Sequence, residues 1–137
     1  MQTKVLGTPE WTRELAQQAS TRLEHRVIVG TARVNASNQN VQLAAAGTGR
    51  VRRGVKAVDL AAPVEFGANR NQVKTYRRRS KNGGTHEVTR HTSNQLRWRK
   101  RTGHVFYPAT ARFVPRIASL WAQTVVRTIA FAFEGRT

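Results

Sequence analysis

The sequence predicts an α+β fold in which an N-terminal and a C-terminal amphipathic helix pack on an antiparallel β-sheet. Two observations support it: apolar residues recur at helical spacing near both ends, and short strand-like runs with Gly and Asn turns lie between them. The 137 residues fit one domain, residues 1–137, long enough to bury a core. The sequence has no cysteine, which excludes disulfides and thiolate metal sites.

The first predicted element is a helix from Pro9 to Arg26. Thr8 can cap it, Pro9 suits the first helical position, and Glu10 lies near the positive end of the helix dipole. An apolar stripe recurs every four residues and consists of Trp11, Leu15, Ala19 and Leu23. The acids expected on the solvent-facing surface are Glu10, Glu14 and Glu24. This helix is therefore expected to pack one face on the sheet.

The middle of the chain predicts a β-hairpin followed by a basic loop. A strand from Val27 to Val34, a polar turn over residues 35–40 and a returning strand from Val41 to Ala46 form the hairpin. The segment from Gly47 to Gly54 lacks the spacing of a dinucleotide loop or a P-loop, which favours a basic loop or strand edge. Residues 57–62 fit either a short strand or a helical turn.

The end of the chain predicts a strand and then the strongest helix. His104–Tyr107 fits a strand entering the core, and the helix runs from Val114 or Pro115 to Phe133, with a turn before it from Pro108. Its apolar face consists of Ile117, Leu120, Trp121, Val125, Ile129 and Phe133, extended by Val126, Ala130 and Phe131. A face this wide needs burial on more than one side, and a small sheet covers only one. A neighbouring subunit is therefore expected, and with it an oligomer.

Basic residues concentrate in one internal stretch, from Arg70 to Arg101. It holds eleven Lys and Arg residues against the single acid Glu87, a net charge of +10 out of +17 for the chain. Apolar segments flank it on both sides, which indicates a structured projection toward an anionic partner. A charge this high attracts polyanions of any kind, so nucleic acid and an acidic protein surface both remain open.

The basic stretch itself predicts a β-hairpin insertion over residues 70–101. Its arms are Lys74–Ser80 and Thr85–Thr92, joined by Asn82-Gly83-Gly84. Tyr76 and Trp98 are interleaved with the cations, as in single-strand binding, although Trp98 packing beneath the hairpin is the simpler interpretation. A ribbon with so few apolar residues is expected to stay exposed.

No constellation of residues favours catalysis, a cofactor or a metal. His86, Glu87 and His91 lack the His-Glu-x-x-His spacing of a metalloprotease, because the histidines are five positions apart. Asp59 and Glu65 are isolated, so no carboxylate pair offers general acid and base. We expect no enzyme activity, no cofactor and no metal site.

Two segments carry a resemblance to a known family. Ala62-Pro63-Val64-Glu65-Phe66-Gly67 resembles the Val-Glu-Phe-Gly signature of tailed-phage neck and tail-completion proteins, the head–tail connector family. Tyr107-Pro108-Ala109, followed by Phe113-Val114-Pro115-Arg116 and a terminal amphipathic helix, resembles the closing segment of that family. The resemblance implies a non-enzymatic α+β subunit that forms a ring, six-fold in the family, between the capsid portal and the tail tube.

The resemblance also implies partners and a location. The ring would contact portal-side neck proteins and the tail tube, and DNA would pass through its lumen without sequence recognition. The implied location is the virion head–tail junction, after assembly in the host cytoplasm, with no membrane contact. A tail terminator capping the tail tube is an alternative within the family. A non-sequence-specific nucleic-acid-binding protein is the alternative from another class.

Two sets of residues are assigned to these contacts. The cations predicted to contact the next ring or DNA are Lys74, Arg77, Arg78, Arg79, Lys81, Arg90, Arg97, Arg99, Lys100 and Arg101. The residues predicted to serve subunit packing are Glu65, Phe66, Trp121, Val125, Ile129 and Phe133. Glu65 is included as an acid in a basic chain beside a glycine turn, a candidate partner for a neighbouring arginine.

Overall fold

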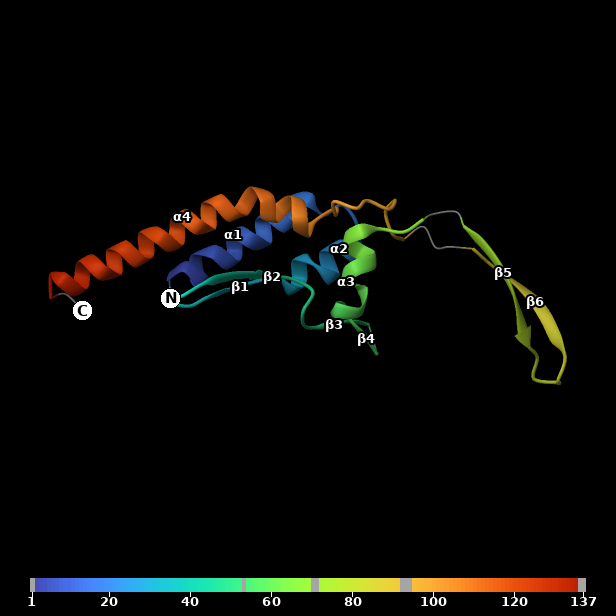
Figure 1. Cartoon of the computed structure of the whole chain (residues 1–137). Helices are drawn as coiled ribbons and strands as arrows, with labels where there is room; N and C mark the ends of the chain where they lie inside the picture. The colour runs from blue at the N-terminus through green and yellow to red at the C-terminus, as the bar shows by residue number, and fades with distance from the viewer. Residues whose placement is uncertain (1, 53, 70–71, 92–94, 136–137) are drawn as a thin grey trace.

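A computed structural model describes residues 2–52, 54–69, 72–91 and 95–135. The chain is mixed α+β, with helices at both ends, as predicted (Figure 1). The helices are α1 (Gln2–Gln18), α2 (Arg22–Val27), α3 (Ala57–Phe66) and α4 (Phe106–Phe133), and a 3₁₀ turn spans Val29–Thr31. The strands are β1 (Arg33–Ala36), β2 (Val41–Ala44), β3 (Arg50–Arg52), β4 (Val55–Lys56), β5 (Val73–Arg79) and β6 (Thr85–His91).

The strands form three separate antiparallel pairs in the described part of the chain, rather than the single sheet that the sequence predicted. β1 pairs with β2, β3 with β4, and β5 with β6. The first pair is the predicted hairpin, although its first strand is shorter than expected: α2 ends at Val27, and the strand begins only at Arg33. Val34 is the one fully buried residue of β1, so this small sheet covers only part of α1.

Helix α1 begins seven residues before its predicted start, so Pro9 lies inside it and Thr8 is not its cap. The Thr8 hydroxyl donates instead to the Lys4 carbonyl (2.8 Å), as expected of a threonine within a helix. The helix ends at Gln18, and Thr21 caps a separate helix, α2. The Thr21 hydroxyl accepts from the Glu24 N–H (3.1 Å), while the Glu24 carboxylate accepts from the Thr21 N–H (3.1 Å). This capping box interrupts the predicted helix.

Two of the acids expected on the surface are buried. Glu24 is 2% exposed because its carboxylate is held in the capping box. Glu14 is 4% exposed and accepts from the Arg116 guanidinium of α4 at 3.0 Å. Glu10 is exposed, as predicted. The apolar stripe of α1 therefore shares its buried face with an ion pair that joins α1 to α4.

The core lies where α1 and the first half of α4 pack against each other. Trp11 and Leu15 are fully buried, and the Trp11 ring lies 5.4 Å from that of Phe113. The Trp11 indole N–H donates to the Ala44 carbonyl of β2 at 3.3 Å, which fixes the sheet on the same core. At Gly7 an added Cβ would lie 2.8 Å from Ile117, so a glycine lets the two helices approach closely.

The two segments that were ambiguous or wrongly predicted near the basic stretch contain helix and no strand. Residues 57–62 belong to α3, which continues to Phe66, so the helical alternative is correct. His104–Tyr107 is not a strand: Val105 is buried, and α4 starts at Phe106, with Pro115 inside the helix. The signature segment Ala62–Gly67 is therefore a helix end, closed by Gly67 with φ +72°.

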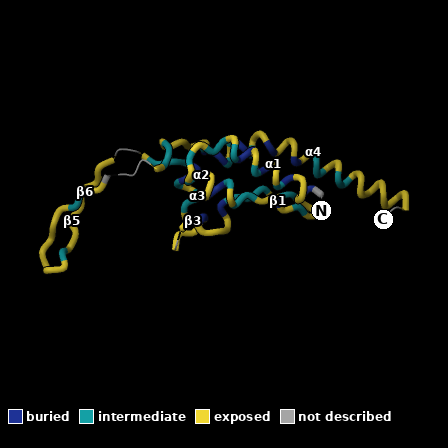
Figure 2. Tube along the Cα trace, turned by 180° about the vertical axis from the view of Figure 1, so that it is seen from behind, coloured by how far each residue is buried: buried dark blue, intermediate teal, exposed yellow. Residues whose placement is uncertain are grey.

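The molecule is elongated. Helix α4 has 28 residues and is about 42 Å long, and its C-terminal third continues past the N-terminus of α1 (Figure 1). The β5–β6 hairpin lies at the opposite end of the molecule, as Figures 1 and 2 both show. Across the described residues, no helix is both long and apolar enough to cross a membrane.

Candidate polyanion-binding hairpin and exposed helix end

The basic hairpin is formed around the predicted turn, with its first strand one residue earlier than predicted; Thr92, the predicted end of the second strand, lies outside the described residues. Its seven-residue strands pair in register from Val73 opposite His91 to Arg79 opposite Thr85. The turn is closed by the Ser80 N–H donating to the Gly84 carbonyl (2.6 Å), and Gly83 supplies a φ of +85°. Every described side chain of the two strands is exposed except Val88, which is half-buried. The hairpin therefore offers both of its faces to a partner.

The two faces of the hairpin carry different charges. Residues opposite each other in an antiparallel pair share a face, and successive pairs alternate between faces. One face, called here the cationic face, consists of Lys74, Tyr76, Arg78, His86, Val88 and Arg90. The other, called the mixed face, carries Val73, Thr75, Arg77, Arg79, Thr85, Glu87 and Thr89. The cationic face has three Lys and Arg residues and no acid, whereas Glu87 offsets one of the two arginines on the mixed face.

The root of the hairpin is held by backbone hydrogen bonds between residues 65–68 and 97–104. The Ala68 N–H donates to the Arg97 carbonyl (2.9 Å), the Lys100 N–H to the Phe66 carbonyl (2.8 Å), and the His104 N–H to the Glu65 carbonyl (2.9 Å). Gly67 lies between them, where an added Cβ would collide with the carbonyls of Arg97 and Trp98. We call this set of backbone hydrogen bonds the root clamp.

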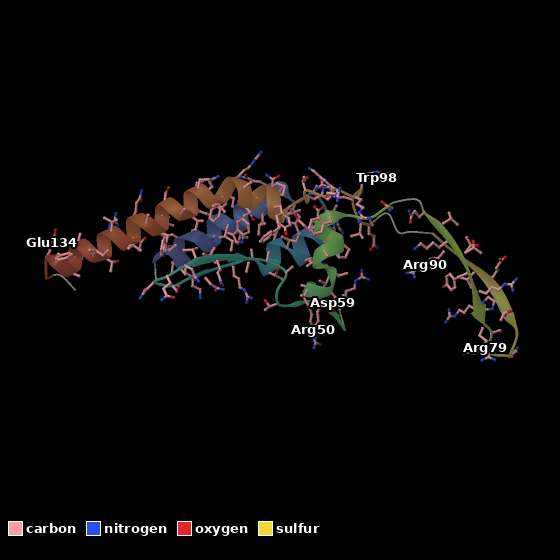
Figure 3. All side chains as sticks on the ribbon, in the orientation of Figure 1. Arg50, Asp59, Arg79, Arg90, Trp98 and Glu134 are labelled. Atoms are coloured by element: carbon pink, nitrogen blue, oxygen red, sulfur yellow. The ribbon has the colours of Figure 1, made fainter. Side chains whose placement is uncertain are left out.

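The predicted contact cations do not all serve the same purpose. Arg97 is half-buried at the root clamp, and its guanidinium lies 3.5 Å from the Glu24 carboxylate, so it has a partner within the chain. The other nine assigned cations are exposed. Figure 3 shows Arg79 near the hairpin tip and Arg90 nearer the body. Arg70, the first residue of the predicted basic stretch, is outside the described residues.

The partners of Glu65 within the chain are backbone N–H groups, rather than the neighbouring arginine that the sequence suggested. It is 5% exposed, and its carboxylate accepts hydrogen bonds from the backbone N–H groups of Val105 (3.2 Å), Phe106 (2.8 Å) and Tyr107 (3.1 Å). These are orphan donors at the N-terminus of α4, where a negative charge also complements the helix dipole. Glu65 is therefore the cap of α4, supplied from α3.

Tertiary capping by Glu65 explains the glycine beside the site. Gly103 has φ +80°, and a Cβ there would collide with the Glu65 carboxylate. Phe66, also assigned to subunit packing, is half-buried, with its ring 5.7 Å from that of Tyr107. The Val-Glu-Phe-Gly segment thus joins α3, the hairpin root and α4.

The C-terminal third of α4 is apolar and exposed. Ile129 is 51% exposed and Phe133 is 88% exposed, and Val126 and Phe131 are also exposed. Trp121 and Val125 are half-buried, and the Trp121 indole N–H donates to the Ser37 carbonyl (3.3 Å) in the β1–β2 turn. Val5 and Leu6 of α1 are also exposed, and Figure 2 shows the C-terminal end of α4 largely in yellow. An apolar surface of this extent is typical of an interaction site.

The geometry offers little for metal chemistry. Within residues 2–52, 54–69, 72–91 and 95–135, no group of three His, Asp or Glu side chains is placed to hold a metal ion. His86 and Glu87 lie in β6, opposite Arg78 and Arg77. The side chain of His91 lies outside the described part of the structure.

Comparison with known proteins assigns no family: no protein-family model, curated protein or solved structure matches the chain. The resemblance to neck and tail-completion proteins therefore remains a prediction from the sequence.

Proposed function

We propose that this chain is a structural subunit of a tailed-phage virion that forms a ring at the head–tail neck. The observation that carries the proposal is the apolar C-terminal third of α4, which the chain leaves exposed. Burying such a face against a second copy removes Val126, Ile129 and Phe133 from water. Each large apolar side chain that passes from exposed to fully buried stabilises the complex by about 1.5–3 kcal/mol.

A ring is the arrangement that the family resemblance implies. It requires the exposed end of α4 to meet a different surface of the next copy, head to tail. Head-to-tail contacts close into rings when the rotation between subunits allows it. The family resemblance of Ala62–Gly67 supplies the six-fold ring number, the portal-side and tail-tube partners and the position in the virion.

The basic hairpin supports passage of DNA through such a ring. It is exposed, and it lies at the end of the molecule away from the apolar helix end (Figure 1). Around a six-fold axis its charge is repeated six times, which favours polyanions near the lumen without sequence recognition. A tail terminator would use the same subunit surfaces, at the tail end of the junction.

The double variant Ile129→Asp with Phe133→Asp tests the oligomer. Both side chains are exposed in the single chain, so the variant is expected to fold but to remain a monomer, because a buried carboxylate in the interface is strongly unfavourable. The measurement is mass by size-exclusion chromatography with light scattering, together with negative-stain microscopy for rings. The matched control is Val58→Asp with Val114→Asp, two exposed apolar positions outside the helix end.

The proposal fails if the unmodified chain is a stable monomer both alone and with tail-tube or portal-side proteins. It also fails if both double variants change the oligomeric mass equally. A stable monomer that binds duplex DNA at nanomolar Kd in physiological salt would favour the second candidate, a free nucleic-acid-binding protein. That candidate rests on the exposed hairpin cations alone.

A further inference from the structure

The two faces of the β5–β6 hairpin differ in charge, which indicates the side on which an anionic partner binds. The cationic face carries Lys74, Arg78 and Arg90 with no acid, while the mixed face pairs Arg77 with Glu87 across the strands. We infer that the cationic face binds the phosphate backbone of duplex DNA and that the mixed face does not. This names the DNA-binding face of the proposed ring subunit. Only the statement that the DNA passes through a ring rests on the proposed function.

The spacing of the cations fits a duplex. Lys74 and Arg90 form one pair, and Arg78 and His86 form a second pair four positions along the strands. At the rise of a β-strand the two pairs are about 13 Å apart. The major groove of B-DNA is about 12 Å wide, so the two pairs can lie over the two phosphate backbones that border it.

The centre of the cationic face is apolar and lies between the Lys74–Arg90 pair and Arg78. Tyr76 is 45% exposed and is opposite the half-buried Val88. In this arrangement the Tyr76 ring lies over the groove, and its hydroxyl can reach a phosphate or a water. The face has no Asn or Gln to read adenine, and its Lys and Arg side chains are assigned here to the phosphates that border the groove, so the contact is expected to be independent of sequence.

The composition of the hairpin favours DNA over an acidic protein. The buried centres of protein–protein interfaces are depleted in charge and rich in apolar side chains. The cationic face has one apolar pair, and its three Lys and Arg residues would each need a matched carboxylate on a protein surface. A duplex presents phosphates at regular spacing along both strands and needs no such match.

The test compares two triple variants that remove the same charge from different parts of the hairpin. The cationic-face variant is Lys74→Gln, Arg78→Gln and Arg90→Gln, and the control is Arg77→Gln, Arg79→Gln and Lys81→Gln. All six side chains are exposed, so both variants are expected to keep the fold, which circular dichroism checks. The measurement is the Kd for a mixed-sequence duplex of about 25 base pairs by fluorescence anisotropy, over a range of salt concentrations.

The cationic-face variant is expected to lower the slope of log Kd against log salt by about 3, one for each phosphate that it no longer neutralises. Its Kd should rise at least roughly tenfold near 0.1 M salt, while the control stays within about threefold. A third variant, Lys74→Arg with Arg78→Lys and Arg90→Lys, keeps the charge and should keep the binding.

Three results would overturn the inference. Equal weakening by both triple variants would mean that only total charge matters. Unchanged duplex binding in the cationic-face variant would show that this face does not touch the DNA. Weaker binding to a polyglutamate probe, with duplex binding retained, would assign the face to an acidic protein. Light scattering on the same samples reports ring formation separately, so failure of DNA binding and failure of ring formation are distinguishable.

Discussion

A single carboxylate, that of Glu65, organises the centre of this molecule. It accepts hydrogen bonds from the backbone N–H groups of residues 105–107. Glu65 itself lies at the end of α3, about forty positions earlier in the chain. The sequence marks Glu65 as unusual but does not indicate these partners, because a cap from a distant segment leaves no local pattern. The capping box of Thr21 and Glu24 is different: its residues are three positions apart, a recognisable signature in the sequence.

Glu65→Ala is expected to lower the free energy of unfolding by about 2–3 kcal/mol, since it leaves three helix N-terminal donors without their charged acceptor. Glu65→Gln keeps an acceptor oxygen and should cost less. The measurement is urea denaturation followed by Trp fluorescence. The control is Glu10→Ala, an exposed acid of α1, which should change stability by less than about 0.5 kcal/mol. Equal losses in the Glu65 and Glu10 variants would contradict the capping role.

Among the helices and strands, the turn signals predicted both hairpins correctly, whereas the predicted helix start at Thr8-Pro9 and the continuous helix through Thr21 were wrong. The turns of the β1–β2 and β5–β6 hairpins were predicted because Asn, Ser and Gly mark them directly. The prediction of a single sheet was wrong because each described strand pairs only with the strand next to it in sequence. The strand at 104–107 was wrong because the cap from Glu65 allows α4 to start at Phe106. The early start of α1 also depends on packing, since Gly7 lies against Ile117 of α4.

The root clamp gives Gly67 a role that the glycine of the hairpin turn does not share. Gly67→Ala combines a positive-φ backbone conformation that is nearly restricted to glycine, costing about 1–3 kcal/mol for other residues, with a collision against the carbonyls of Arg97 and Trp98. It is expected to open the clamp and to speed hydrogen exchange at the Ala68 and Lys100 amides.

Gly83→Ala is the matched control for Gly67→Ala. Gly83 has a similar φ of +85°, but no atom lies within 4 Å of an added Cβ. The Gly83→Ala variant should therefore lose only the stability that the positive φ costs a non-glycine residue, and hydrogen exchange at the root clamp should be unchanged. If both variants accelerate exchange at Ala68 and Lys100 alike, the collision at the clamp is not the cause.

At the scale of the whole molecule, the apolar helix end and the basic hairpin lie at opposite ends of one elongated body (Figure 1). Composition indicated both surfaces before the structure, because exposed charge and excess apolar surface are properties of the sequence. Their separation could not be predicted, since it depends on how α4 passes α1 and on the root clamp. In the proposed ring, the apolar end of α4 makes the subunit contacts. The basic hairpin contacts the DNA in the lumen or the next ring along the axis.

Reversing the charge of Arg77, Arg78 and Arg79 to Glu is expected to block head–tail joining, because three anions replace three cations at the hairpin end. The measurement is the yield of infectious particles, with free heads and free tails counted by electron microscopy. Normal subunit rings together with unjoined heads and tails are expected. Intact infectious particles from this variant would refute a role for the hairpin in joining.

The hairpin has one more property that follows from its strand pairing. β5 and β6 pair only with each other in the described part of the chain, so each leaves a row of backbone donors and acceptors facing water. Such rows are templates for edge-to-edge aggregation, and charged side chains are one means by which proteins prevent it. The arginines of this hairpin thus also keep free subunits apart by mutual repulsion. In the proposed ring, an anionic partner that neutralised this charge would let neighbouring hairpins approach, so the same residues would delay association until the partner is present.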